Sequence, residues 1–203
     1  MDDASHVISR TRISVRRFFD ELASRWDSII DSGHESRLEA LLSGIRWRPP
    51  VLDAGSGTGV MWGVLRRTGV PLNEVVAMDI STRMLACARP ERPARVAADA
   101  HRMPFRDATF GTVICNSCLP HFDELSLALR EMARVIRPGG ALVVCHSEPR
   151  EVINRHHRDT GGVVGGHELP EPAELGRMLK DIGMQPEILR DSPGGYLVTA
   201  GKK

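Results

Sequence analysis

Residues 51–59 read VLDAGSGTG, a short apolar strand followed by three glycines at alternate positions. Glycine lets the backbone approach a ligand closely, and a helix beginning near Val60 offers unpaired N–H groups. The dinucleotide fingerprint G-x-G-x-x-G would place glycine at position 60, and a Walker loop would need a nearby lysine, which this segment lacks. The loop therefore predicts a ligand site at a strand end but argues against both phosphate-binding motifs.

Acidic residues stand at the ends of three successive predicted strands. Asp53 precedes the glycine loop, Asp79 ends the second strand and Asp99 follows the third. Asp53 would repel a pyrophosphate and attract an ammonium or sulfonium group, and an acid in the place of Asp79 accepts ribose hydroxyls. Asp99 is placed to accept an adenine N–H, while the N–H of Ala100 reaches a ring nitrogen. The three acids predict a cationic nucleoside ligand; the alternative is that each merely caps a helix.

Strands and helices alternate from residue 51, which indicates a mostly parallel α/β sheet. Helices are expected near 59–68, 81–88 and 123–136, the last with Asp123 as N-cap and Pro138-Gly139-Gly140 as a closing turn. The predicted parallel strands are Val51–Ala54, Glu74–Asp79, Arg95–Ala98, Thr112–Asn116 and Ala141–His146.

The two ends of the chain differ from this pattern. Residues 14–46 carry apolar side chains at helical spacing and predict two helices, with the Arg10, Arg12, Arg16 and Arg17 run as a solvated face. The tail predicts a helix over Glu171–Gly183 and then a hairpin. Its strands are Glu187–Arg190 and Tyr196–Ala200, so the last strand is expected to be antiparallel.

Composition describes an ordinary soluble chain of one domain. It has 203 residues, 41% hydrophobic and 26% charged, with a net charge of +1. This balance gives no basic excess for nucleic acid, and the longest apolar runs are too short to span a membrane. The polar N-terminus is unlike a signal peptide, and four scattered cysteines suit a reducing compartment, so we expect a cytoplasmic protein.

Several stretches together resemble a class I S-adenosylmethionine-dependent methyltransferase of the small-molecule group that includes the ubiquinone and menaquinone biosynthesis enzymes. The resemblance implies a Rossmann-like three-layer sandwich whose seven-stranded sheet has its last strand antiparallel, with an N-terminal helical lid. One departure is Gly111, where the group usually has an acid. The matching stretches are FFDELASRWD (18–27), VLDAGSGTG (51–59), MDISTRMLACAR (78–89), AADAHRMPFRDATF (97–110), VICNSCLPHF (113–122) and REMARVIRPGGALVV (130–144).

The resemblance implies S-adenosylmethionine as the cofactor and gives each motif a role. Asp53, Gly55 and Gly57 would hold its methionine portion, and Asp79 its ribose. Asn116, at the end of the fourth strand, would lie near the transferring methyl group.

The adenine would lie between Ile80 and Met84, with its polar edge on Asp99 and Ala100. For Ile80 and Met84, ordinary core packing is an equal alternative. The resemblance also implies three parts within one domain over 1–203: a lid over 1–48, a cofactor-binding half over 49–146 and an acceptor side over 147–203.

Histidines near the expected acceptor position are the candidate catalytic bases. His146 ends the fifth strand, His121 follows the fourth, and His157 lies in a polar, His-rich insert over 147–170. If 150–158 is helical, Arg150, Asn154 and His157 share one face. Imidazole titrates near neutrality and can take a proton as the methyl group arrives, although each histidine alone is more often structural. His146 is the first choice because its strand end faces the pocket in this fold.

A metal site is the next alternative, since Cys115-x-x-Cys118-x-x-His121 resembles a ligand pattern. However, Cys115 falls inside an apolar strand and no second C-x-x-C exists, so no metal is expected. The proline-rich signature of many nucleic-acid and protein N-methyltransferases is absent after Asn116, which leaves a small-molecule acceptor. A nicotinamide oxidoreductase and a non-catalytic S-adenosylmethionine-binding protein remain as alternative functions.

Overall fold

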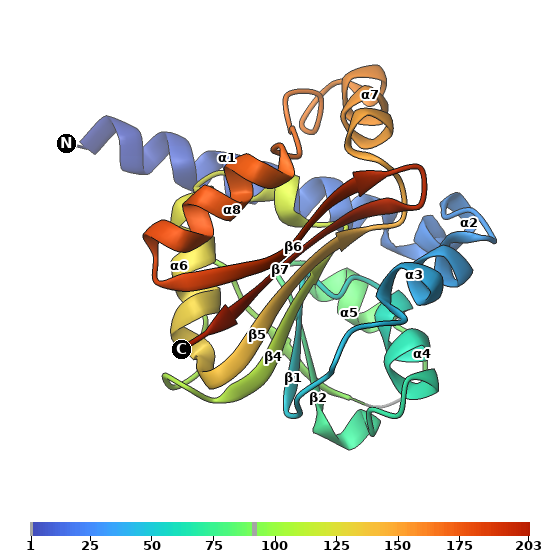
Figure 1. The fold of residues 1–203 in the computed structure, drawn as a ribbon. Coiled ribbons are helices and arrows are strands. Elements are labelled where there is room, and N and C mark those ends of the chain that lie inside the picture. Colours follow the sequence, from blue (N-terminus) through green and yellow to red (C-terminus); the bar gives the residue numbers. More distant parts are fainter. Residues whose placement is uncertain (1, 91–92) are drawn as a thin grey trace.

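The structure is a computed structural model that describes residues 2–90 and 93–203, with side chains from residue 11. These residues fold around a seven-stranded sheet (Figure 1). The strand order is β3-β2-β1-β4-β5-β7-β6. β1 to β5 pair in parallel, and β7 runs antiparallel to both β5 and β6, which confirms the predicted sheet. The strands are β1 Val51–Ala54, β2 Val75–Asp79, β3 Ala94–Ala97, β4 Phe110–Asn116, β5 Ile136–His146, β6 Met184–Ser192 and β7 Gly195–Lys202.

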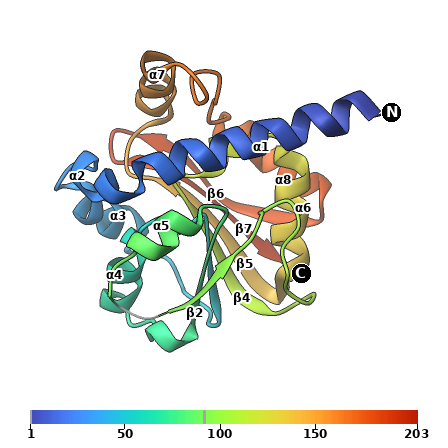
Figure 2. The same ribbon diagram turned by 180° about the vertical axis from the view of Figure 1, so that it is seen from behind.

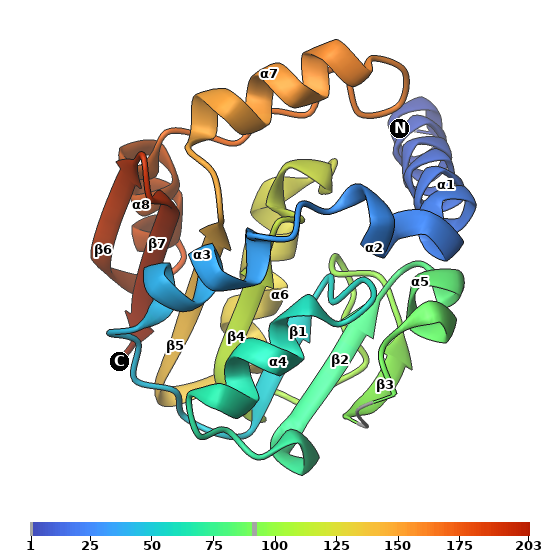
Figure 3. The same cartoon turned by 90° about the vertical axis from the view of Figure 1, so that its right-hand side faces the viewer.

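Helices cover both faces of the sheet and its carboxyl edge. α3 and α4 lie on one face and α6 and α8 on the other, while α1 and α7 lie beyond the carboxyl ends of the strands (Figure 3). Short 3-10 helices span Ala23–Arg25, Leu72–Glu74 and Leu119–His121. The α-helices are α1 Asp2–Leu22, α2 Trp26–Ile29, α3 His34–Leu42, α4 Val60–Arg67, α5 Thr82–Cys87, α6 Leu125–Val135, α7 Arg150–Thr160 and α8 Pro172–Asp181.

Alternating side chains of the central strands build two apolar cores. Val51 and Val143 pack into the core beneath α3 and α4, whereas Leu52 and Leu142 pack into the core beneath α6 and α8. This is the period of two expected for strands that are covered on both faces. Because β1 has β2 on one side and β4 on the other, the strand order reverses at β1, and a crevice opens at the carboxyl ends of β1 and β4.

Three local predictions were wrong. The region 14–46, predicted as two helices, contains the end of α1, a 3-10 turn, α2 and α3. Pro138-Gly139-Gly140 does not end α6 in a turn but lies within β5, where the register with β4 shifts. The N-cap of α6 is Glu124, because the Asp123 side chain is engaged by Arg12 and His101.

A steric restriction explains why glycine occupies position 111. Its missing Cβ would lie 2.2 Å from the carbonyl oxygen of Arg48 and 2.9 Å from that of Pro49. The segment that enters β1 therefore crosses directly over this position, and the N–H of Gly111 donates to the carbonyl of Pro50 at 2.9 Å. The departure from the resembled group lies at the amino end of β4, opposite the crevice.

We expect Gly111→Ala to lower the free energy of unfolding by about 1–3 kcal/mol, the range for overpacking, because the contacted atoms belong to the backbone. Gly44→Ala is the matched control, since nothing lies within 4 Å of its added Cβ. Urea unfolding of the two variants measures the difference. Equal stability of both would contradict the steric explanation.

Candidate functional site

A cavity of about 1070 Å³, open mouth included, lies at the carboxyl ends of β1, β2 and β4. Of the predicted site residues, three are not on its described wall, namely Asp53, His146 and His157. Those on the wall are Gly55, Gly57, Asp79, Ile80, Met84, Asp99, Ala100, Asn116 and His121.

The glycine loop is clamped onto β2. Gly55 donates its N–H to the carbonyl of Met78 at 2.8 Å, and its φ of 77° is one that L side chains rarely adopt. A Cβ at Gly55 would lie 2.4 Å from Cys118 Sγ, so the loop packs tightly on the residue that follows β4. At Gly57, with φ of 54°, nothing lies within 4 Å of an added Cβ, and this backbone faces the cavity.

Asp79 joins the loop to the start of α5. Its two carboxylate oxygens accept the N–H groups of Gly57 and Ser81, each at 2.8 Å. Burial raises the pKa of Asp79, and the hydrogen bonds from Ser81 and Gly57 oppose that rise. Each oxygen keeps a further lone pair for a hydroxyl donor in the cavity. This is the arrangement that a ribose-binding carboxylate requires.

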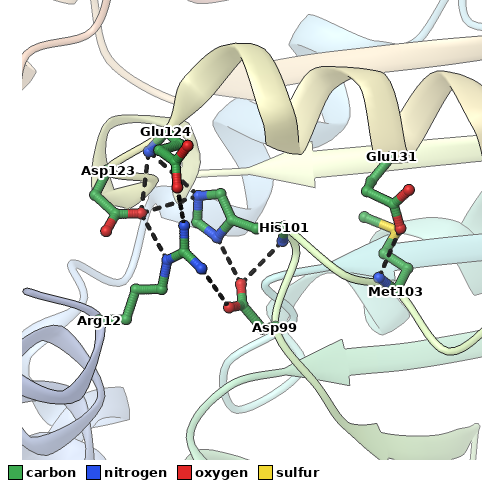
Figure 4. A network of polar contacts seen from close by, with 7 residues as sticks. All are labelled: Arg12, Asp99, His101, Met103, Asp123, Glu124 and Glu131. Atoms are coloured by element: carbon green, nitrogen blue, oxygen red, sulfur yellow. Dashed lines mark hydrogen bonds and ion pairs between the residues drawn. The ribbon is translucent and has the colours of Figure 1, made fainter. Parts of the chain in front are cut away.

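Asp99 lies at the centre of a charged network that reaches the N-terminal helix (Figure 4). It accepts from the His101 N–H at 2.9 Å and contacts His101 Nδ1 at 2.5 Å, while Arg12 donates to it at 3.3 Å. Arg12 also pairs with Asp123 at 2.9 Å and with Glu124 at 2.5 Å. Burial alone would raise the pKa of Asp99, but His101 and Arg12 lower it overall, so this carboxylate is anionic.

The network corrects the prediction that the N-terminal arginines form a solvated face. Arg16 and Arg17 are exposed, as predicted, but Arg12 is half-buried and binds three acids. The side chain of Arg10 lies outside the described residues. Arg12 and Asp99 are 87 positions apart, so no local pattern reveals their contact.

Further contacts hold the N-terminal helices against the cavity wall, and Figure 2 shows α1 crossing the carboxyl edge of the sheet. Asp20 accepts a hydrogen bond from Ser81 Oγ at 2.6 Å, and Asp27 accepts one from Thr58 Oγ1 at 2.5 Å. Phe19 packs edge-on against His121 with the ring centroids 5.0 Å apart. The helices are thus tied to the loop, to α5 and to a wall histidine.

Asp53 lies beneath the glycine loop instead of on the cavity wall. It is fully buried, and Trp62 Nε1 donates to its Oδ2 at 3.1 Å, while Oδ1 has no partner within the described part of the chain. Burial raises the pKa of Asp53 to about 7, the Trp62 hydrogen bond opposes the rise, and the charge of Asp79 adds to it. No sequence pattern singled out Trp62, although it lies only nine residues after Asp53.

His146 is sealed at the end of β5. Its exposed fraction is 1%, its ring packs edge-on against Tyr196 at 6.0 Å, and Nε2 has no partner among the described residues. Burial, with the charges of His157 and His34, lowers its pKa to about 3. His146 is absent from the described cavity wall, so its role as the catalytic base stays a prediction.

The insert over 147–170 contains α7, and its inner face carries the predicted pair Asn154 and His157. Asn154 exchanges two hydrogen bonds with the backbone of Leu169, at 2.8 and 3.2 Å. The ring of His157 contacts the His167 carbonyl at 2.7 Å, so Nδ1 must carry the proton. Both side chains therefore fasten the second half of the insert to α7.

His121 is the predicted histidine that reaches the cavity wall. Burial and the neighbouring histidines lower its pKa well below the ordinary value. Nearby, Ser117 has a φ of 55°, a strained conformation of the kind that often marks a functional site. Ser117 was not singled out from the sequence as a site residue. Among the described residues, no three His, Cys, Asp or Glu side chains are grouped to hold a metal ion.

Comparison with known proteins agrees with this geometry. A family described as "Methyltransferase domain" matches residues 52–144. Residues 52–144 are therefore similar to a methyltransferase domain. The chain is 39% identical over 137 residues to the demethylmenaquinone methyltransferase of Mycobacterium marinum, covering 64% of this chain and 58% of that protein. The expected resemblance to class I methyltransferases is thereby confirmed.

Two further similarities extend beyond the domain. The malonyl-[acyl-carrier protein] O-methyltransferase of Halorhodospira halophila is 32% identical over 189 residues, covering 88% of this chain and 63% of that protein. An S-adenosylmethionine-dependent methyltransferase from Thermotoga maritima has the same fold, with a TM-score of 0.73 at 15% identity, covering 92% of this chain and 99% of that one. The chain therefore spans about three fifths of the length of these curated relatives.

The residues present fit S-adenosylmethionine. The exposed backbone at Gly57 gives room for a ligand, Asp79 offers hydroxyl acceptors, and the anionic Asp99 stands beside Ala100 on the same wall. Ile80 and Met84 add apolar surface between them. No described helix combines the length and the apolar character needed to cross a membrane.

Asp53→Asn should change how stability depends on pH. The folded parent binds a proton at Asp53 up to about pH 7, whereas an unfolded carboxyl releases it near 3.8. The parent therefore loses stability from this group as the pH rises from about 4 to about 7. Asparagine can still accept the hydrogen bond from Trp62, but it does not titrate. The free energy of unfolding of the variant relative to that of the parent should therefore rise across this window by an amount on the order of a few kcal/mol.

Urea unfolding of parent and variant across this window measures the difference. Buried histidines such as His146, whose pKa is lowered, have the opposite pH dependence, but they are present in both proteins and cancel. A stability difference that stays constant from about pH 4 to about pH 8 would show that Asp53 ionises at its ordinary pKa.

Proposed function

We propose that this protein transfers a methyl group from S-adenosylmethionine to a small, planar, largely apolar acceptor that carries an ionisable proton. The single observation that carries the proposal is that nine predicted residues, from the four stretches 55–57, 79–84, 99–100 and 116–121, meet on the wall of one cavity at the strand-order reversal. The similarity of residues 52–144 to a methyltransferase domain supports the reaction type. The division into lid, cofactor half and acceptor side remains part of the proposal.

In this proposal the carboxylates divide the cofactor between them. Asp79 receives the ribose hydroxyls, and Asp99 and the Ala100 N–H receive the adenine edge. Gly55 and Gly57 let the amino-acid end lie against bare backbone, and Asn116 stands beside the methyl group. Asp53 acts from below, holding the loop through Trp62 without touching the ligand.

The apolar side chains around the rest of the wall support a planar acceptor. Phe19, Trp26, Ile30 and Phe122 contribute to it. An acceptor with a free carboxylate would need an unpaired cation, but Arg12, the arginine on the described wall, already binds three acids. Of the acceptors named in the relatives, this favours the aromatic naphthoquinol type over the malonyl type.

The cofactor supplies a methyl group already activated on a sulfonium sulfur. The protein's own contribution is then alignment, exclusion of water and removal of the acceptor's proton. The N-terminal helices exclude water by lying across the mouth, through the contacts of Asp20 and Asp27. His121 is the base in this proposal, because it is on the wall whereas His146 and His157 are not.

Asp79→Asn should weaken S-adenosylhomocysteine binding by about 10- to 100-fold, corresponding to the 1.5–3 kcal/mol of a hydrogen bond to a charged group. Titration calorimetry gives the affinity, with Asp181→Asn, an exposed acid on α8, as the matched control. Unchanged affinity in Asp79→Asn, or tighter binding of NAD than of S-adenosylhomocysteine, would overturn the cofactor assignment.

The acceptor class is tested with reduced 1,4-naphthoquinone as the probe. Incubation with S-adenosylmethionine should give S-adenosylhomocysteine and a methylated naphthol product, both detected by mass spectrometry. Malonyl thioester serves as the competing acceptor. Turnover of the thioester with none of the naphthoquinol would contradict the acceptor class while leaving the cofactor site intact.

A further inference from the structure

His121 is held between an aromatic ring and two other histidines. Phe19 packs on it from α1, and the rings of His157 and His167 lie 5.0 and 5.2 Å away. His121 Nδ1 is 2.9 Å from His167 Nδ1, a hydrogen-bond distance. The other ring nitrogen of His121 is Nε2, which lies outside this contact on a residue of the cavity wall.

The groups around His121 oppose a lasting positive charge on it. His157 faces it from α7, His167 from the loop that follows, and His146 from β5. Burial and these histidines all lower its pKa, and no carboxylate among the described residues offsets them. A buried base in such surroundings holds a proton poorly unless it passes another one on.

His167 is better placed to carry a charge. It is partly exposed, and Asp123 raises its pKa, although burial and His157 lower it overall. Because the two Nδ1 atoms share one hydrogen bond, one ring must donate and the other accept. If His121 donates, its Nε2 is bare and able to take a proton from a ligand in the cavity.

We infer that His121 and His167 form a two-histidine relay that carries the acceptor's proton from the cavity to solvent. The inference rests on the proposed function for the identity of the proton's source. His121 is the catalytic residue of the pair, and His167 is a positioning residue that acts through it.

The step balances with one proton in and one out. The acceptor's O–H bond breaks, its electron pair stays on the acceptor, and the proton joins His121 Nε2. The Nδ1–H bond of His121 breaks in turn, and its proton joins His167 Nδ1. His167 then releases its Nε2 proton to water, so each ring remains neutral between turnovers with its tautomer exchanged. The pair resets after product release, when His121 gives its Nε2 proton to water in the open cavity, the Nδ1 proton of His167 returns to His121 Nδ1, and His167 takes a proton from solvent at Nε2.

The insert is built to hold His167 in this position. The Nδ1–H of His157 donates to the carbonyl of His167 itself, and Asn154 binds the backbone of Leu169 on both its N–H and its carbonyl. Two side chains on one face of α7 thus fix the backbone at the relay residue and two residues after it. This accounts for Asn154 and His157 without placing either on the cavity wall.

The first test reads the tautomer directly. In ¹⁵N spectra of histidine side chains near neutral pH, His121 should show a protonated Nδ1 and a bare Nε2, with a hydrogen bond to His167 Nδ1. His167→Phe should remove that preference without loss of S-adenosylhomocysteine affinity. A protonated Nε2 on His121 in the parent would overturn the relay, whatever the protein's activity.

The second test measures transfer to reduced 1,4-naphthoquinone. His167→Asn keeps a hydrogen-bond acceptor near the place of Nδ1, but asparagine cannot take up and release a proton. The value of kcat should therefore fall about 10²-fold, the lower range for acid–base catalysis. In His167→Ala, added imidazole should restore part of the rate, and a purely structural role for His167 would not give this rescue. His156→Asn, an exposed neighbour on α7, is the control with parental rates.

The two failures are distinguishable. Parental kcat in His167→Asn, or no imidazole rescue in a folded His167→Ala that binds S-adenosylhomocysteine, would reject the relay while methyl transfer stands. Absence of transfer by the parent to any acceptor would reject the proposed function, and the tautomer measurement would still decide the direction of the His121–His167 hydrogen bond.

Discussion

The two backbone N–H groups that meet on the Asp79 carboxylate organise this site. One comes from Gly57 in the loop after β1 and the other from Ser81 at the start of α5. The shared carboxylate joins two loops that leave neighbouring strands, and this fixes the crevice where the strand order reverses. Burying the Asp79 carboxylate costs hydration free energy, and the two charge-assisted hydrogen bonds offset that cost. The cavity wall depends on this carboxylate, because it binds both the glycine loop and the N-cap residue of α5.

The second carboxylate, Asp53, supports the loop in a different protonation state. With its pKa raised to about 7, it is sealed beside Trp62 and spares the interior much of the cost of a second buried charge next to Asp79. Asp99, by contrast, stays anionic because Arg12 and His101 face it. Three acids that look equivalent in the sequence therefore have three electrostatic roles: a buried support, a backbone clamp with free lone pairs, and a link to the N-terminal helix.

Local patterns predicted the features that depend on neighbours in sequence. The bounds of β1 agree to the residue, and the antiparallel end of the sheet followed from the hairpin linker before Gly195. The glycine loop and its acids followed from spacing alone. What the sequence could not show are pairings between distant residues, such as Arg12 with Asp99 and His121 with His167, which are 87 and 46 positions apart. His146 was favoured because it ends a strand, but its side chain points into the packing beside Tyr196 and not into the cavity.

The central claim is that one ligand is held between the glycine loop and the successive strand ends beneath α1. Hydrogen exchange of the parent protein with and without S-adenosylhomocysteine tests this claim most directly. Amides of residues 55–59, 79–84 and 98–101 should slow together on binding, and those of α1 should slow with them because Arg12 and Asp20 tie that helix to the same site. Binding without slowed exchange in these three segments, or with protection confined to another face of the sheet, would contradict the account.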